Sequence, residues 1–201
     1  MNEIKARVEQ LRAQMKAHGV DAYIVPTSDF HETEYVCDHF KAREYMSGFT
    51  GSAGTCVFTA DAAKLWTDGR YFIQAAKQLE GSGIELMRMG DEGVLTIEAY
   101  LREALPAHAT LGFDGRVMNT AMVERLCAQL NEVTISCDMD LVGAIWQDRP
   151  ELPASKTFEL AQRYTGKSAA QKLSEVREAM AEAGADIHII TRVDDIAWLL
   201  N

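Results

Sequence analysis

The densest group of possible metal ligands in the sequence is His31-Glu32-Thr33-Glu34, with His39 close behind. A metal site that activates water needs several carboxylates and at least one imidazole, all converging from rigid elements. These residues lack the HExxH spacing, which places two imidazoles on one face of a helix. We therefore interpret the segment as a solvated or capping loop and not as a metal site.

A second acidic pair, Asp194-Asp195, stands directly before the apolar sequence IAWLL. Carboxylates at the start of a helix are favoured by its unpaired amides and by the helix dipole. We predict that this pair caps a helix and binds no metal.

The glycine-rich sequence GFTGSAG, at residues 48–54, is another candidate for chemistry. In a GxSxG nucleophile elbow, glycines stand two positions before and two after the serine, whereas Thr50 and Gly54 flank Ser52 here. The segment leads into the strand-like sequence TCVFT, so it also differs from a phosphate-binding loop that opens a helix. We predict a tight turn in which glycines permit close backbone approach.

The last candidate is Arg70, in the sequence WTDGRYF at residues 66–72. A predicted strand ends there, and Asp68 could cap the helix predicted after it. Open α/β sheets place ligands at the carboxyl ends of strands, and a guanidinium is well suited to hold polar ligand groups. Taken alone, the residues favour the alternative that Arg70 is tied to Asp68 or another carboxylate for structural reasons.

Helices and strands alternate around these candidates, which predicts an α/β fold. A first helix is predicted where apolar residues recur at helical spacing, before Gly19, which suits the position after a helix end. Further helices are predicted near 39–47, 71–79, 94–104, 120–130 and 141–146, and strands at 22–26, 55–59, 64–67, 84–89, 110–113 and 133–136. Because the second and third strands form a hairpin, we expect a mixed, mostly parallel central sheet flanked by helices.

The polar sequence QDRPELP, at residues 147–153, contains two of the four prolines and predicts a domain boundary. We assign a first domain to residues 1–148, a linker to 149–157, and the incomplete start of a second α/β domain to 158–201. In this last part, Ser168 and Gln171 form a capping-box pattern before a helix that ends at Gly184, and IHII reads as a strand.

The second part repeats the beginning of the chain at a constant offset of 165 residues. The matched pairs are Leu11/Val176, Arg12/Arg177, Met15/Met180, Gly19/Gly184, Asp21/Asp186, Ile24/Ile189, Val25/Ile190 and Asp29/Asp194. Any helix–glycine–strand unit looks partly like this, but ungapped agreement over the whole stretch favours a duplication. Because the second copy is too short for a core of its own, we expect the chain to be a fragment of a longer protein.

The composition excludes several classes of function. The 201 residues carry 30 acidic and 20 basic side chains, a formal net charge of −10 that disfavours nucleic acid and acidic membranes as partners. No apolar run approaches the ~20 residues needed to cross a bilayer. The four cysteines show no CxxC or zinc-knuckle spacing, so a reducing cytoplasm is the expected compartment.

Four segments resemble, in this order, the amino-terminal region of the cytosolic three-domain aminopeptidase P family: EYMSGFTGSAGT, LWTDGRYFIQAAKQL, IWQDRPELP and DDIAWLLN. These enzymes are Xaa-Pro aminopeptidases of the creatinase/prolidase metallopeptidase group. The resemblance extends from residue 21 to residue 201. It implies a creatinase-like amino-terminal domain followed by the start of a second, related domain.

The resemblance implies that the intact protein is a cytoplasmic homodimer that releases the residue preceding proline from the amino terminus of a peptide. Its two divalent metal ions, commonly manganese, and its catalytic residues would lie in a third domain. For this chain we therefore expect no metal and no catalytic residues. Arg70 matches the family arginine that reaches the substrate, so we expect Arg70 to bind the peptide and the chain to shape its cleft.

Other interpretations remain. The chain could be a stand-alone, catalytically inactive binding module of the same fold, which the length of the encoding reading frame would reveal. A creatinase-like amidinohydrolase or a prolidase usually has a single amino-terminal domain, and the repeat argues against these. A nuclease-like function lacks a clustered acidic metal site and conflicts with the negative charge.

Overall fold

Helix α1 (Glu3–Ala17) forms where the apolar spacing predicts it, in a computed structural model that describes residues 3–201. Its apolar face is buried against the central sheet. Gly19 follows in the left-handed region with a φ of 66°, and the Val20 amide donates to the Met15 carbonyl at 2.8 Å. A glycine after the helix end permits this capping bond because it has no Cβ to clash.

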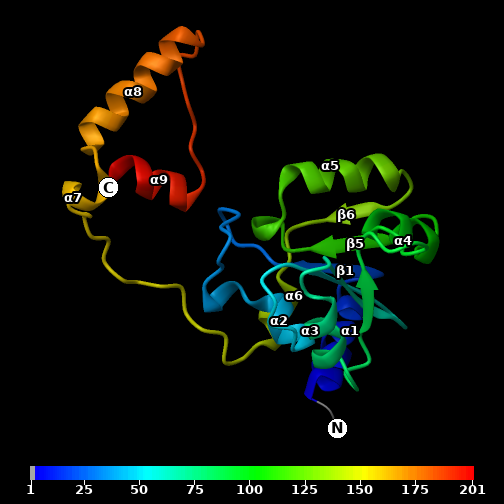
Figure 1. The fold of residues 1–201 in the computed structure, drawn as a ribbon. Coiled ribbons are helices and arrows are strands. Elements are labelled where there is room, and N and C mark those ends of the chain that lie inside the picture. Colours follow the sequence, from blue (N-terminus) through cyan, green and yellow to red (C-terminus); the bar gives the residue numbers. More distant parts are fainter. Residues whose placement is uncertain (1–2) are drawn as a thin grey trace.

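Six strands form one sheet in the order β4-β3-β2-β1-β5-β6 (Figure 1). Strand β2 runs antiparallel to both of its neighbours, and the other three pairings are parallel. The strands are β1 (Ala22–Pro26), β2 (Thr55–Thr59), β3 (Ala63–Thr67), β4 (Glu85–Arg88), β5 (Thr110–Phe113) and β6 (Thr134–Ser136). The prediction of a mixed, mostly parallel sheet with a β2–β3 hairpin is confirmed.

Helices cover both faces of this sheet (Figure 1). Side chains of β1 alternate between two apolar cores, with Tyr23 and Val25 facing one core and Ala22 and Ile24 the other. Helices α1, α2, α3 and α6 close the first core, and α4 and α5 close the second. The α-helices of this unit after α1 are α2 (Ala42–Ser47), α3 (Phe72–Gln78), α4 (Ile97–Ala104), α5 (Thr120–Gln129) and α6 (Leu141–Ile145). Two short 3-10 helices are η1 (Asp38–Phe40) and η2 (Gly115–Val117).

The helix caps of this unit agree only partly with the sequence predictions. Asn119 caps α5, because its side-chain oxygen accepts the Met122 amide at 2.8 Å. The prediction that Asp68 caps α3 is wrong, because Tyr71 occupies the N-cap position and makes no side-chain capping bond. The Asp68 carboxylate binds Arg70 instead.

The second part of the chain contains α7 (Gln162–Thr165), α8 (Ala169–Glu182) and α9 (Val193–Leu200). The predicted capping box of Ser168 and Gln171 is present at the start of α8. After α8, Gly184 has a φ of 66°, and the Ala185 amide donates to the Met180 carbonyl at 2.9 Å. This is the cap of α1 displaced by 165 positions, so the repeat is visible in the backbone geometry as well as in the sequence.

Residues 187–190 do not form the predicted strand. Ile187 and Ile189 are 80% and 79% exposed, and no ladder joins them to any residue between 3 and 201. The equivalent strand β1 is paired on both sides, by β2 and β5. An extended segment that lacks such neighbours cannot satisfy its amides in a sheet.

The predicted capping by Asp194 and Asp195 is also wrong in detail. Arg192 occupies the N-cap position of α9, and the two carboxylates lie in the first helical turn. There they still interact favourably with the helix dipole.

The two parts are joined by an extended, exposed stretch at residues 151–161 (Figure 1). One contact returns across this connection, where the Thr191 carbonyl lies 2.8 Å from His31 Nδ1. A carbonyl oxygen can only accept, so Nδ1 carries the proton in this bond. Within residues 3–201, no helix is long and apolar enough to cross a membrane.

Candidate functional site

The carboxyl ends of five strands meet at one edge of the sheet, because β2 alone runs in the opposite direction. Two Asp-Gly-Arg turns lie at this edge, one after β3 at residues 68–70 and one after β5 at residues 114–116. The first contains Arg70, the predicted binding residue. The second also follows a predicted strand, and the repeated DGR triplet is the signal by which the sequence could reveal it.

Arg70 is held by Asp68 in a bidentate ion pair. Arg70 Nε lies 2.9 Å from Asp68 Oδ1 and Nη2 lies 2.8 Å from Oδ2, while the Arg70 amide also donates to Oδ1 at 3.0 Å. The Arg70 side chain remains 69% exposed. The structural pairing considered from sequence is therefore present, and it leaves the guanidinium accessible to a ligand.

The electrostatics of this turn follow from the pair. The hydrogen bonds and charge of Asp68 raise the pKa of Arg70, with a smaller contribution from Glu34. In return, the Arg70 guanidinium lowers the pKa of Asp68 below its usual value of 3.8. Both groups are thus ionised at neutral pH, and the turn as a whole carries no net charge.

The glycine-rich sequence at residues 48–54 forms the close-packed turn that we predicted, and it contacts Tyr71, the residue after Arg70. Ser52 Oγ lies 2.7 Å from the hydroxyl of Tyr71. A Cβ added to Gly51 would lie 2.2 Å from the Phe49 ring and 2.8 Å from the Tyr71 ring. Glycine is therefore required here by close packing against two aromatic rings.

Arg43, which sequence reasoning missed, holds this turn in place from the buried side. Its side chain is buried and donates to the carbonyls of Phe49 and Gly51, and its Nε donates to Thr27 Oγ1 at 2.9 Å. Burial lowers the pKa of Arg43. Nothing in the sequence AREYMS distinguishes this arginine from a solvated one, because its acceptors are backbone carbonyls of a distant loop.

A cleft of about 300 Å³ opens between this turn and residues 34–44, a segment that includes η1 and the start of α2. Ser52 and Gly51 line one side, and Glu34 and Tyr35 line the other. Because Ser52 contacts Tyr71 and Glu34 acts electrostatically on Arg70, the cleft adjoins the Arg70 turn. Its size is at the lower end of the range for small-ligand pockets.

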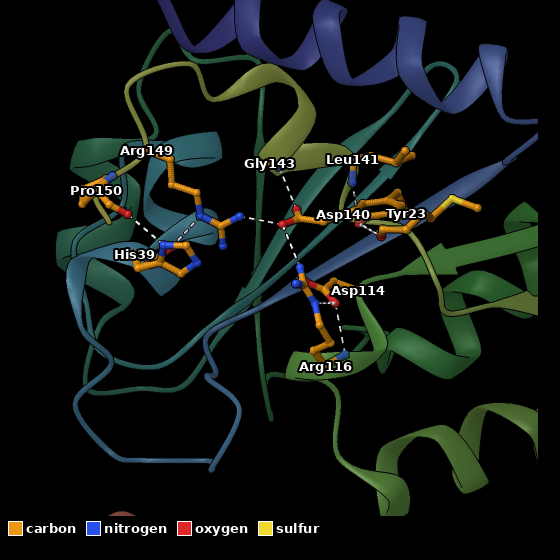
Figure 2. Close-up of polar contacts among 10 residues, drawn as sticks. Tyr23, His39, Asp114, Arg116, Asp140, Leu141, Gly143, Arg149 and Pro150 are labelled. Carbon is orange, nitrogen blue, oxygen red and sulfur yellow. Dashed lines mark hydrogen bonds and ion pairs between the residues drawn. The ribbon is translucent and has the colours of Figure 1, made fainter. Parts of the chain in front are cut away.

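The second Asp-Gly-Arg turn repeats the pair distances of the first, with Arg116 Nε and Nη2 at 2.9 and 2.8 Å from the Asp114 oxygens. Figure 2 shows what differs: Arg116 Nη2 also reaches Asp140 Oδ2 at 3.1 Å, and Asp140 in turn binds Arg149 Nη1 at 2.5 Å. This turn is part of an extended ion network.

Arg149 carries this network to the predicted domain boundary. Its Nε donates to the His39 carbonyl at 2.8 Å, and His39 Nδ1 lies 2.8 Å from the Pro150 carbonyl (Figure 2). Asp140 also accepts the Gly143 amide at 2.7 Å, which caps α6. These bonds attach residues 149 and 150 to the first unit, and the division into domains stays a prediction.

Three of the four candidate metal ligands, His31, Glu32 and His39, are engaged in other contacts. His31 and His39 bind backbone carbonyls, and Glu32 accepts from Asn119 Nδ2 at 2.6 Å. Asp29 holds the loop by accepting the amides of His31 and Thr33 at 2.8 and 3.0 Å. No group of three or more His, Cys, Asp or Glu residues suited to a metal occurs between residues 3 and 201.

The mixed six-stranded sheet, with helices packed on both faces, defines this unit as an α/β domain. Two models of the creatinase/prolidase N-terminal domain match the chain, one at residues 7–144 and one at residues 148–201. The chain belongs to the creatinase/prolidase N-terminal domain family. Both halves of the sequence repeat thus match models of the same description.

Relatives in other organisms are Xaa-Pro aminopeptidases. The chain is 39% identical to Xaa-Pro aminopeptidase 1 of Dictyostelium discoideum, over 98% of this chain and 33% of that protein. It is 39% identical to aminopeptidase P2 of Arabidopsis thaliana, over 91% of this chain and 26% of that protein. The chain therefore spans about a third or less of the length of these relatives.

A solved structure supports the same assignment. The X-prolyl aminopeptidase of Caenorhabditis elegans, a cytosolic enzyme with a di-nuclear active site, matches 99% of this chain with a TM-score of 0.89 and 28% identity. The match covers 34% of the nematode chain. The arrangement of both parts of our chain thus agrees with the nematode enzyme.

Proposed function

We propose that this chain is the substrate-facing, non-catalytic part of a Xaa-Pro aminopeptidase, and that Arg70 anchors the peptide. The observation that carries the proposal is the exposed guanidinium at the carboxyl edge of the sheet, oriented by Asp68 and set beside a cleft. An oriented guanidinium loses less conformational freedom when it binds, which makes it a better anchor than a free side chain. The relatives named above support the reaction class.

The intact enzyme, by this proposal, is cytoplasmic, forms a homodimer and uses two divalent metal ions, with manganese as the first candidate. The nematode relative supports the cytosolic location and the di-nuclear centre. Residues 3–201 provide no fitting set of metal ligands. By this proposal the metal ions are held by other parts of the intact enzyme, and the role of this chain is to bind and orient the peptide.

A direct test is to incubate the 201-residue chain with Mn²⁺ and an Xaa-Pro peptide and to measure release of the first residue. We expect no turnover above a blank without protein. Turnover at the level of an aminopeptidase would show that this chain carries its own catalytic centre and would overturn the non-catalytic assignment.

The role of Arg70 is tested by Arg70→Ala in the intact enzyme that contains this chain. Loss of a charge-assisted hydrogen bond to the substrate is expected to cost about 1–3 kcal/mol, so kcat/KM should fall roughly five- to 150-fold. The control is Arg102→Ala, an exposed arginine on α4 at the opposite face of the sheet. A change of less than twofold for Arg70→Ala would remove Arg70 from the substrate site.

A further inference from the structure

We infer that Asp68 makes Arg70 a site for neutral carbonyl groups in the interior of a peptide, so that the site does not select a free carboxyl terminus. This inference rests on the proposed function, since it requires that Arg70 contacts the peptide. It concerns the class of ligand at that contact: peptides that continue beyond Arg70, or that end in an uncharged group.

The geometry of the ion pair limits what Arg70 can still bind. Asp68 occupies the edge formed by Nε and Nη2, where both donors lie within 2.9 Å of its oxygens. This is one of the edges on which a guanidinium holds a carboxylate with two parallel bonds. Nη1 hydrogen-bonds to no protein atom of the described residues, and it offers donors for a peptide carbonyl.

The charge of the turn acts in the same direction. Asp68 cancels the charge of Arg70, and Glu34 adds a negative charge close enough to affect the Arg70 pKa. An incoming carboxylate therefore gains little Coulomb energy, although it loses hydration when it binds. A neutral carbonyl keeps the benefit of the hydrogen bond without this repulsion.

The adjoining cleft has the same charge preference as the Arg70 turn. Two carboxylates, Glu34 and Glu44, line it and make no ion pair within the part of the chain that the structure describes. The two cations in its wall are engaged: Lys41 lies 2.6 Å from Asp38, and Arg43 is buried beneath the turn. When Asp38 is counted with Glu34 and Glu44, the carboxylates in and beside the cleft outnumber the cations Lys41 and Arg43 by one, and this small negative excess disfavours a carboxylate at the end of a peptide that enters the cleft.

The test is a titration of the 201-residue chain, with the ¹⁵Nε signal of Arg70 followed by NMR and assigned from its loss in Arg70→Lys. The probes are Ala-Pro-Ala as the free acid, the same tripeptide as the amide, and Ala-Pro-Ala-Ala-Ala amide. We expect the tripeptide amide to bind at least as tightly as the acid. The longer amide should bind more tightly than either, because it reaches the cleft.

Asp68→Asn is the decisive variant, since asparagine keeps an acceptor for Arg70 and removes the charge. We expect the affinity for the tripeptide acid to rise about fivefold, the effect of one exposed charge. The affinity for the amide should stay within twofold. The backbone amide spectrum of the variant serves as the control that the fold is kept. Glu34→Gln is a second variant, and its affinity for the tripeptide acid should also rise.

The outcomes separate the two proposals. If none of the three peptides shifts the Arg70 signal, Arg70 is not a peptide contact, and the proposed function of this residue fails. If it moves but the wild-type chain binds the acid at least fivefold more tightly than the amide, the contact is real and the inference about Asp68 is wrong. The inference would also be overturned if the ratio of the affinities for the tripeptide amide and acid were unchanged in both Asp68→Asn and Glu34→Gln.

Discussion

The two Asp-Gly-Arg turns at the carboxyl edge of the sheet have the same internal geometry and different surroundings. In each, the arginine donates to the aspartate from Nε at 2.9 Å and from Nη2 at 2.8 Å. At 68–70 the pair faces solvent beside a cleft, with 37% of the Asp68 side chain exposed. At 114–116 the aspartate is 12% exposed and the pair is joined to Asp140 and Arg149.

This difference shows that a local motif determines the direction of a side chain but not its use. The first turn presents its guanidinium to solvent, which supports the proposed role of Arg70 in binding. In the second turn the guanidinium of Arg116 also binds Asp140, which in addition holds Arg149 and caps the start of α6. We assign it to fixing the end of the first unit, where the chain leaves toward the second.

The largest expected effect comes from removing the centre of the second network. Asp140→Ala deprives Arg149, which is 15% exposed, and the Gly143 amide of their acceptor. A half-buried charge left without its partner and a lost helix cap together should lower the free energy of unfolding by about 3 kcal/mol. Urea denaturation followed by circular dichroism measures this change.

Two other aspartate-to-alanine variants serve as controls for the stability loss of Asp140→Ala. Asp148→Ala removes an exposed carboxylate two residues beyond Trp146 and should change stability by less than about 0.5 kcal/mol. Asp68→Ala, in the first turn, should cost about 0.5 kcal/mol or less, because its pair is solvent-exposed. Equal losses for Asp140→Ala and Asp68→Ala would contradict the division of roles.

The glycines of the two turns give an intermediate effect. A Cβ on Gly115 would lie 2.6 Å from the Cys137 carbonyl oxygen, whereas a Cβ on Gly69 would have no neighbour closer than 3.9 Å. We expect Gly115→Ala to destabilise the chain by about 1–3 kcal/mol, because backbone must shift. Gly69→Ala should be neutral within about 0.5 kcal/mol. Thermal unfolding of both variants in parallel tests the contrast, and equal values would contradict it.

Much of the fold follows from short-range patterns in the sequence. The period of apolar residues located α1, and alternating buried strands located the sheet, because burial of one face is encoded in neighbouring residues. The repeat at an offset of 165 predicted the glycine caps of α1 and α8, which share a φ of 66°. The prediction of a strand at residues 187–190 was wrong, because a strand needs pairing partners that the local sequence does not supply.

The candidate site was only partly predictable, for a related reason. Arg70 and its tie to Asp68 involve residues two positions apart, which sequence can indicate. Arg43 binds carbonyls of residues 49 and 51, and Arg149 binds groups at residues 39 and 140. Contacts of this kind depend on the finished fold, so arginines that hold loops look like solvated ones in the sequence.

The smallest expected effect concerns the pH dependence of the first turn. Because Arg70 lowers the pKa of Asp68 below 3.8, the folded chain binds this proton less readily than the unfolded chain. The pair therefore stabilises the fold fully above the unfolded pKa of about 4, and this contribution is lost as the pH falls through the lower, folded pKa.

Asp68→Asn should remove that contribution. At pH 7 the free energy of unfolding should be lower than in the wild type by about 0.3–0.5 kcal/mol, a value reduced by solvent screening at an exposed pair. The difference should vanish as the pH is lowered below the folded pKa of Asp68, and it should shrink at high salt. Urea titrations at a series of pH values and two salt concentrations measure both trends. A difference that grows toward acid would have the wrong sign, and it would mean that the exposed turn is held by something other than its ion pair.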